Sequence, residues 1–265
     1  MGVNMGRAMM KAGEFLRYAG RGMVDLIWPD VCLACSRADA EEGGLCEPCG
    51  RTLLSHVSLP YCPRCGATLG PNILPRLDGC GSCPTALPRF DRVVRLGPYA
   101  APLRTIVREL KYHRRVELCG RMGGLLAQAV TAACDDGPPD VILPVPMHWR
   151  RRLARGHDHS RVLARAIARP LKLPIGDELI RVRHTPAQVG LTRAQRQENI
   201  RGAFGVVRAE TLGGAHVLLV DDVTTTGATA DEAAAMLAKA GARRVSLAVI
   251  AKSEPPAAYA EYWGR

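Results

Sequence analysis

Two adjacent acids, Asp221 and Asp222, stand directly before a segment rich in hydroxyl groups at residues 224–229. Carboxylates accept hydrogen bonds from the vicinal hydroxyls of a ribose, or hold a Mg²⁺ ion that contacts those hydroxyls. Threonine hydroxyls and backbone N–H groups donate hydrogen bonds to phosphate oxygens. This order of residues is suited to bind a phosphorylated ribose. The expected phosphate ligands, called the threonine loop below, are Thr224, Thr225, Thr226, Gly227, Ala228 and Thr229.

The residues on either side of this loop predict a strand followed by a helix. Residues 216–220 form an apolar run typical of a buried parallel strand, and residues 230–240 carry small or apolar side chains at helical spacing. The threonine loop then lies at a helix N-terminus, where unpaired N–H groups and the helix dipole favour an anion. An ordinary strand, turn and helix with threonine caps is the alternative interpretation.

Residues 217–229 resemble the loop that binds phosphoribosyl pyrophosphate (PRPP) in type I phosphoribosyltransferases. The shared pattern is two apolar residues, Asp-Asp-Val, a variable position, Thr-Thr-Gly, a second variable position and Thr. The resemblance implies an α/β fold with a parallel sheet flanked by helices, and strands are expected near residues 141–145, 216–220 and 244–250. It also implies that Asp221 and Asp222 take part in catalysis and that PRPP binds together with Mg²⁺.

Eight of the ten cysteines form four Cys-x-x-Cys pairs. Two thiolates at this spacing can bind one metal ion, and two such pairs complete a tetrahedral Zn²⁺ site. The gaps between the pairs favour two sequential sites, and interleaved pairing is the alternative. The expected zinc ligands are Cys32, Cys35, Cys46 and Cys49 for one site and Cys62, Cys65, Cys80 and Cys83 for the other.

Both zinc sites are expected to be structural, because four protein ligands leave no open coordination position. Disulfides and an iron–sulfur cluster are the alternatives. Neighbouring Cys-x-x-Cys pairs bridge one another poorly, and the N-terminal residues lack the continuous apolar segment of a secretion signal. The remaining cysteines, Cys119 and Cys134, lie in an apolar helical stretch and are expected in the core.

Four cysteine pairs followed by a PRPP loop resemble the ComF, or late-competence, family of double-zinc-ribbon, phosphoribosyltransferase-like proteins. The resemblance covers residues 26–252 and includes a helix ending in Leu110-Lys111-Tyr112. It implies a link to the DNA-uptake machinery and to single-stranded DNA. We expect an amphipathic helix at 1–28, a double zinc ribbon at 29–88 and a phosphoribosyltransferase-like domain at 89–265.

An arginine-rich loop follows the strand expected near residue 141. In type I phosphoribosyltransferases the equivalent loop binds pyrophosphate, and guanidinium groups pair well with phosphate oxygens. Surface charge is the alternative role for these residues. The candidates are Arg150, Arg151, Arg152 and Arg155.

The family usually continues this loop as Arg-Gly-Phe-Asn-Gln, whereas this chain has His157, Asp158 and His159 after Gly156. The replacement changes the donors, acceptors and charge on the side of the site that would meet an acceptor. Two histidines beside an acid could ligate a metal, and a helix N-terminus capped by Asp158 or Ser160 is the competing interpretation.

Residues 181–204 resemble the flexible loop that closes over the substrates of phosphoribosyltransferases. Such a lid excludes water from an oxocarbenium-like ribose. Thr192 and Gln195 predict a capping box that opens a short helix. Solvated arginines beside a structural helix cap are the alternative. The polar candidates of this loop are Arg183, Gln188, Arg193 and Arg196.

The net charge of +11 is concentrated outside the cysteine-rich region. Residues 145–201 contain 13 basic and 4 acidic side chains, which suits a phosphate-rich ligand. Thiolates bound to two zinc ions would make the first 90 residues net negative, which argues against a DNA-binding zinc finger. No apolar run reaches about 18 residues, so no membrane span is expected. A cytoplasmic location is expected, and both a monomer and a homo-oligomer are compatible with the sequence.

Three functions are compatible with this sequence. The first is Mg²⁺-dependent transfer of ribose 5-phosphate from PRPP to an acceptor, with release of pyrophosphate. The second is a non-catalytic sensor of PRPP or of a nucleotide that uses the same loop. The third is handling of single-stranded DNA by the basic region, although few aromatic residues lie among the basic ones to stack on bases.

Overall fold

The computed structural model describes residues 31–37, 44–113, 115, 117–134, 137–149, 153, 156–186 and 190–262. The helix expected at residues 1–28 lies outside this described part. Among the described residues, no helix is both long enough and apolar enough to cross a membrane.

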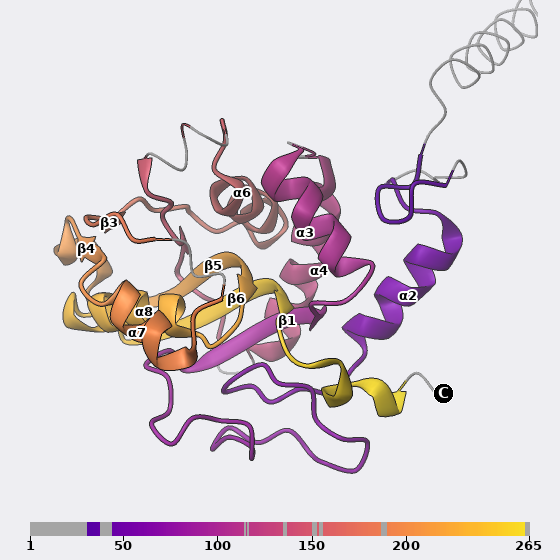
Figure 1. The fold of residues 1–265 in the computed structure, drawn as a ribbon. Coiled ribbons are helices and arrows are strands. Elements are labelled where there is room, and N and C mark those ends of the chain that lie inside the picture. Colours follow the sequence, from indigo (N-terminus) through magenta and orange to yellow (C-terminus); the bar gives the residue numbers. More distant parts are fainter. Residues whose placement is uncertain are drawn as a thin grey trace, which may run out of the picture.

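A four-stranded sheet, parallel throughout, forms the centre of the α/β domain (Figure 1). Its strands are buried along most of their length, which explains why the sequence shows continuous apolar runs instead of alternation. The predicted parallel sheet is thereby confirmed. In spatial order the strands are β1 (Arg92–Pro98), β6 (Arg244–Lys252), β5 (His216–Thr224) and β2 (Val141–Pro144).

Strand β5 continues past residue 220, where the sequence analysis ended it. Asp221 pairs with Val249 of β6, and Thr224 pairs with Lys252. Helix α8 (Ala228–Lys239) begins two residues earlier than expected. The turn between them therefore shrinks to residues 225–227, and both acids are held by the sheet.

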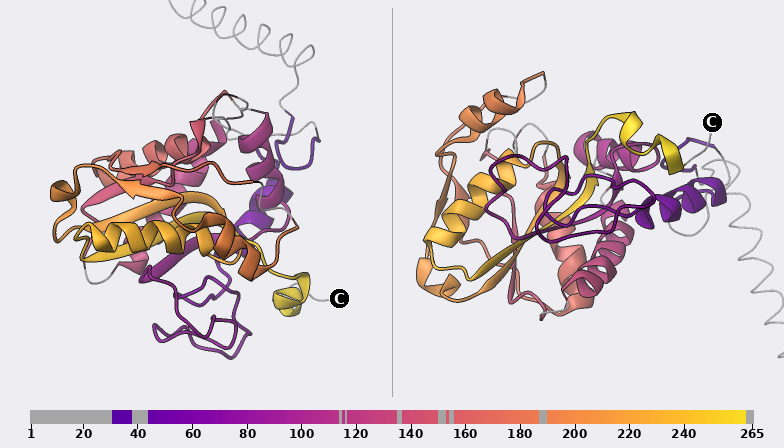
Figure 2. Two further views of the ribbon diagram at one scale, coloured as in Figure 1. Left: turned by 60° about the vertical axis from the view of Figure 1, so that its left-hand side comes forward. Right: turned by 90° about the horizontal axis from the view of Figure 1, so that it is seen from below.

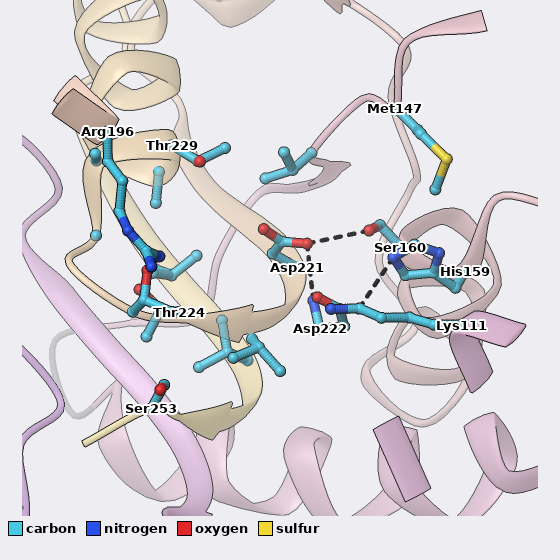
Figure 3. Close-up of a pocket in the computed structure, with 18 of the residues that line it drawn as sticks. Lys111, Met147, His159, Ser160, Arg196, Asp221, Asp222, Thr224, Thr229 and Ser253 are labelled. Carbon is cyan, nitrogen blue, oxygen red and sulfur yellow. Dashed lines mark hydrogen bonds and ion pairs between the residues drawn. The ribbon is translucent and has the colours of Figure 1, made fainter. Parts of the chain in front are cut away.

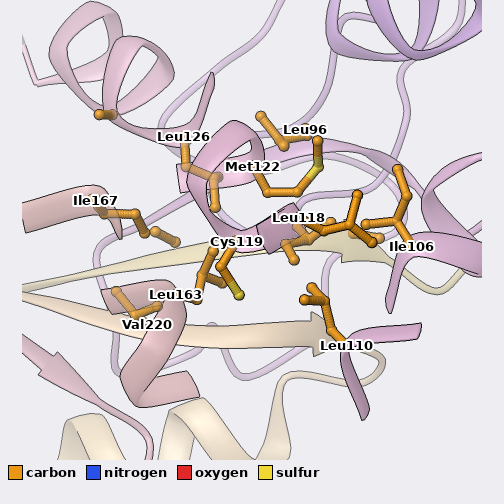
Figure 4. Close-up of a cluster of buried hydrophobic side chains, with 14 of the residues drawn as sticks. Leu96, Ile106, Leu110, Leu118, Cys119, Met122, Leu126, Leu163, Ile167 and Val220 are labelled. Atoms are coloured by element: carbon orange, nitrogen blue, oxygen red, sulfur yellow. The ribbon is translucent and has the colours of Figure 1, made fainter. Parts of the chain in front are cut away.

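Helices cover both faces of the sheet, as burial of parallel strands requires (Figures 1 and 2). One face packs against three helices: α3 (Leu103–Tyr112), α4 (Glu117–Ala133) and α6 (His159–Leu171). The other face packs against α8. Figure 4 shows the larger core, in which Leu110, Met122 and Ile167 come from three different helices. Cys119 and Cys134 are buried in it, as predicted.

The contact between α4 and α6 depends on Gly123. A Cβ atom at this position would lie 2.4 Å from Cβ of Ala166 and 2.7 Å from its backbone carbon. The two helix backbones approach too closely for any larger residue. This contact fixes α6, whose N-terminal turn reaches the cavity described below.

A small antiparallel ribbon stands beside the main sheet and consists of β3 (Leu179–Arg181) and β4 (Phe204–Val206). Between its strands lies α7 (Arg193–Ile200), which begins with the predicted capping box of Thr192 and Gln195. The short 3₁₀ turn η1 (Ala209–Leu212) leads from β4 into β5.

In the cysteine-rich region, helix α2 (Glu47–Val57) starts directly after Cys46. The following loops lie next to the C-terminal 3₁₀ turns η2 (Pro256–Ala258) and η3 (Ala260–Tyr262) (Figures 1 and 2). The hydroxyl of Tyr262 donates a hydrogen bond to the carbonyl oxygen of Leu69. The C-terminal end of the described chain thus packs against the cysteine-rich region.

Candidate active site

A cavity of about 540 Å³ opens at the carboxyl ends of β5, β6 and β2. This is the position where ligands of parallel α/β sheets bind. Its residues gather at two ends, seen on opposite sides of Figure 3. The acid end consists of Lys111, His159, Ser160, Asp221 and Asp222. The phosphate end consists of Arg196 and the threonine loop without Thr226, which lines a smaller neighbouring cavity.

Asp222 at the acid end is held by two basic side chains. Its Oδ2 atom lies 2.9 Å from Nζ of Lys111 and 3.0 Å from Nε2 of His159 (Figure 3). Burial by itself would raise the pKa of the Asp222 carboxyl, but Lys111 and His159 hold it well below its usual range. Asp222 is therefore ionised and fixed in place.

Asp221 has a different environment, although it is the neighbouring residue. Its Oδ1 accepts hydrogen bonds from Oγ of Ser160 at 3.3 Å and from the backbone N–H of Asp222 at 2.9 Å. Within the described part of the chain it forms no ion pair. Burial and the charge of Asp222 raise the pKa of Asp221 to about 6. Because Asp221 has no ion-pair partner among the described residues, its carboxylate is free to accept a hydrogen bond from a ligand hydroxyl or to contact a metal-bound ligand.

In the segment that departs from the family pattern, the capped helix N-terminus is confirmed, whereas His157, Asp158 and His159 do not gather around one metal position. Asp158 is the N-cap of α6, and its side chain accepts a hydrogen bond from the backbone N–H of Arg161 at 3.1 Å. His159, in the first turn of α6, brings an imidazole nitrogen within 4.8 Å of ligand atoms of Asp221 and Asp222. His157 instead points to α3, where its Nε2 lies 2.6 Å from the carbonyl oxygen of Leu110.

The phosphate end is built from the turn before α8. Gly227 is the N-cap of that helix and has a φ of 82°, a left-handed conformation that favours glycine. Oγ1 of Thr226 accepts a hydrogen bond from the N–H of Ala228 at 3.4 Å. Nη1 of Arg196 donates to Oγ1 of Thr225 at 2.7 Å, which brings α7 over the loop. These groups surround a space at a helix N-terminus, where phosphate is favoured.

The remaining candidates of the flexible loop separate in the structure. Arg183 donates to the carbonyl oxygens of Asn199 and Arg201 and does not line the cavity. Arg193 lines a smaller neighbouring cavity. The sequence analysis did not assign Lys111 or Arg181, which line the main cavity from α3 and β3. Arg150, Arg151, Arg152, Arg155 and Gln188 lie outside the described residues.

The eight paired cysteines gather in two sequential groups, each with its sulfur atoms within 4.8 Å of one another. Cluster 1 is Cys32, Cys35, Cys46 and Cys49, and cluster 2 is Cys62, Cys65, Cys80 and Cys83. The Sγ atoms of Cys35 and Cys46 are 3.6 Å apart, and those of Cys62 and Cys83 are 3.7 Å apart. A tetrahedral site with Zn–S bonds of about 2.3 Å has S···S edges of roughly 3.8 Å. The thiol groups therefore fit two structural zinc ions.

Comparisons with known proteins agree with this division of the chain. The description "Double zinc ribbon domain" matches residues 23–85, and "Phosphoribosyl transferase domain" matches residues 157–261. "DNA utilization protein YhgH" of Salmonella typhi is 36% identical over 225 residues, which cover 83% of this chain and 95% of the relative. "Competence protein F" of Haemophilus influenzae is 30% identical over 228 residues, covering 84% and 96%.

The chain belongs to the ComF family. Its ComF-type organisation places a double zinc ribbon before a phosphoribosyltransferase-like domain, as the resemblance predicted.

Solved structures that match part of this chain include phosphoribosyltransferases. Glutamine PRPP amidotransferase from B. subtilis, complexed with ADP and GMP, is 23% identical. The match covers 54% of this chain and 30% of the amidotransferase chain, with a TM-score of 0.37. Adenine phosphoribosyltransferase from Leishmania donovani is 20% identical, covers 57% and 58%, and gives 0.35.

Proposed function

We propose that the main cavity binds PRPP with Mg²⁺ and transfers its ribose 5-phosphate to an acceptor. The observation that carries this proposal is the arrangement of two acids on the end of β5 directly before a threonine loop at the N-terminus of α8. A ribose with a 5′-phosphate needs hydroxyl acceptors and an anion site side by side, and this cavity provides both.

Each group in the cavity has a defined task in this proposal. The threonine loop binds the 5′-phosphate through N–H and hydroxyl donors. Asp221 accepts hydrogen bonds from the ribose hydroxyls, and Asp222 is held beside it by Lys111 and His159. Arg196 lies across the loop and excludes water from the phosphate. Asp158 and Arg161 keep the N-terminal turn of α6, and with it His159, in position.

Transfer breaks the bond between C1′ of the ribose and the pyrophosphate oxygen and forms a bond from C1′ to the acceptor. The electron pair of the broken bond leaves with pyrophosphate, and the acceptor loses a proton to a base or to solvent. Mg²⁺ bound with PRPP supplies charge neutralisation for the leaving group. The acid end suits it, because carboxylate oxygens are the ligands that Mg²⁺ prefers, and Asp221 carries no competing cation.

Isothermal titration calorimetry with PRPP and Mg²⁺ tests this proposal. We expect binding by the wild-type protein and at least a hundredfold weaker binding by the Asp221→Ala/Asp222→Ala variant, because both carboxylates of the acid end are lost. Undiminished binding by that variant, or none by the wild type, would contradict it. Release of pyrophosphate with a panel of bases, amines and ammonia then separates a transferase from a non-catalytic sensor.

A second candidate function is contact with single-stranded DNA, and a specific surface favours it. Helix α3 exposes Arg104 and Arg108, and α6 exposes Arg161, Arg165 and Arg169 at intervals of four residues. Within the described part of the chain none of the five forms an ion pair with an acid. The relatives' names refer to DNA utilization and competence. DNA affinity that falls steeply with salt, and falls further after Arg161→Ala/Arg165→Ala, is the expected result.

A further inference from the structure

Cluster 2 lies behind the phosphate end of the main cavity. A second cavity of about 250 Å³ separates them and is lined by residues of both. Cys65 and Ser82 come from the cysteine-rich loops, and Thr225 and Gly227 come from the threonine loop. The side chain of Lys252, at the end of β6, borders the same space.

Lys252 connects the two sides of this space. Its ammonium group donates a hydrogen bond to the carbonyl oxygen of Thr225. Its aliphatic part runs past Gly66, where an added Cβ would lie 3.7 Å from Cδ of Lys252. Gly66 is one residue from the zinc ligand Cys65 and has a φ of 75°.

A buried charged cluster holds the cysteine-rich loops against the sheet at the same place. Nη1 of Arg95 on β1 lies 3.0 Å from Oε1 of Glu254, two residues after Lys252, and Nη2 donates to Oγ1 of Thr68 at 2.7 Å. The N–H of Thr68 donates to Oε2 of Glu254 at 2.9 Å. The side chains of Arg95 and Glu254 are 0% and 5% exposed. A buried charge left without its partner is strongly unfavourable, so this cluster tolerates little displacement of residues 61–69.

Cluster 1 has different neighbours. Cys32 and Cys46 belong to the apolar core that includes Leu96 and Leu103. Helix α2 meets β1 at Gly97, where an added Cβ would lie 2.8 Å from Cβ of His56. Among the described residues, none from 31–57 lines the main cavity or the second one.

We infer that Lys252 is a positioning residue through which the zinc-held shape of cluster 2, and not that of cluster 1, sets the conformation of the threonine loop and its affinity for phosphate. The inference rests on the proposed function, since it concerns the same phosphate site. Loss of zinc from cluster 2 releases Gly66 and Cys65 from the side of Lys252. The ammonium group then no longer holds the Thr225 carbonyl, and the N–H groups of the loop lose their common direction.

The first test changes Lys252 in the full chain and measures binding of ribose 5-phosphate by calorimetry together with zinc content. Lys252→Met keeps the aliphatic part and removes the ammonium donor, and we expect about tenfold weaker binding with two zinc ions per chain retained. Lys252→Arg restores a donor and is expected to recover most of the affinity. Lys239→Met, an exposed lysine on α8, is the matched control and should bind as the wild type does.

The second test compares the two clusters. Cys80→Ser/Cys83→Ser and Cys46→Ser/Cys49→Ser are each expected to lower the zinc content to about one ion per chain. Binding of ribose 5-phosphate should weaken at least tenfold in the first variant and stay within twofold of wild type in the second. Adding Lys252→Met to the cluster 2 variant should cause little further loss, because both changes break the same connection.

The outcomes separate this inference from the proposed function. Wild-type protein that binds neither PRPP nor ribose 5-phosphate overturns both. Wild-type binding with full affinity in Lys252→Met overturns only the inference, and so does equal loss of affinity in the two cysteine variants. Where a cysteine variant does not fold, the three lysine variants still support or overturn the positioning role of Lys252, since they leave both zinc sites intact.

Discussion

The two ends of the main cavity are organised by different kinds of interaction. At the acid end, side chains from α3, α6 and β5 form ion pairs and hydrogen bonds with one another. At the phosphate end, the backbone of residues 225–227 turns into α8, and its contacts come from Arg196 and Lys252. The charged groups of the acid end already pair with one another, whereas the phosphate end offers N–H and hydroxyl donors that would pair with a bound anion. The acids should therefore affect folding strongly, and the loop should affect binding.

Among the residues of the two ends, Asp222 should have the largest effect on stability when it is replaced. Asp222→Ala leaves Lys111 and His159 next to each other without their ion-pair partner, and we expect a loss of about 3 kcal/mol of unfolding free energy. Urea denaturation measures it. Ser160→Ala, which removes one hydrogen bond to Asp221 at 3.3 Å and no ion pair, is the control and should cost less, about 1 kcal/mol. Equal losses in both variants would contradict the role given to the ion pairs.

Asp221 is predicted to have the opposite effect on stability, so its replacement should stabilise the ligand-free protein. Its folded-state pKa of about 6 lies above its usual value, so the folded protein holds the proton more tightly and stability falls as pH rises from about 4 to about 6. Asp221→Asn removes this cost and should stabilise the ligand-free protein at pH 7 by about 1 to 2 kcal/mol while weakening PRPP binding. The stability gain should vanish below about pH 4. Denaturation curves at pH 4 and pH 7 decide the sign.

At the phosphate end, Gly227→Ala tests the conformation of the loop. The left-handed φ of 82° disfavours a side chain, although the added Cβ would make only ordinary contact with Phe90 at 3.5 Å. We expect a loss of about 1 kcal/mol in stability and a larger loss of affinity for ribose 5-phosphate. Gly124→Ala, in open space on α4, is the matched control and should be neutral or slightly stabilising. Unchanged affinity of the Gly227→Ala variant for ribose 5-phosphate would contradict the role of the loop in binding the phosphate.

The smallest expected effect concerns the arginines of the flexible loop. Arg196→Ala removes the hydrogen bond to Thr225 and should weaken PRPP binding about fivefold, with stability nearly unchanged. Arg183→Ala removes contacts to carbonyl oxygens beyond the cavity and should leave PRPP binding unaltered. Calorimetry on the pair distinguishes a cavity arginine from a structural one, and a reversed order would show that the loop closes in another way.

The strand, acids, threonine loop and cysteine pairs could be predicted because each is encoded within a short segment. Adjacent residues fix the spacing of a Cys-x-x-Cys pair, and an apolar run before a threonine-rich turn fixes a strand followed by a helix. The capping box at Thr192 was predictable for the same reason. The end of β5 was not, because its extension to Thr224 depends on pairing with β6.

The partners of the acids could not be predicted, because they come from distant segments. Lys111 lies 111 residues before Asp222 in the chain, and only the packing of α3 beside the sheet brings them to 2.9 Å. The Leu110-Lys111-Tyr112 segment was noticed as the end of a helix, which was the available signal. His159 was considered as a metal ligand or as part of a helix N-terminus, and the fold places it at the start of α6 against Asp222.

A structure of the protein with PRPP and Mg²⁺ tests the central claim most directly. We predict that the 5′-phosphate lies within hydrogen-bond distance of the threonine loop at the N-terminus of α8, with the ribose hydroxyls next to Asp221. A PRPP molecule bound elsewhere, or one with pyrophosphate in the threonine loop and the ribose away from Asp221, would contradict it.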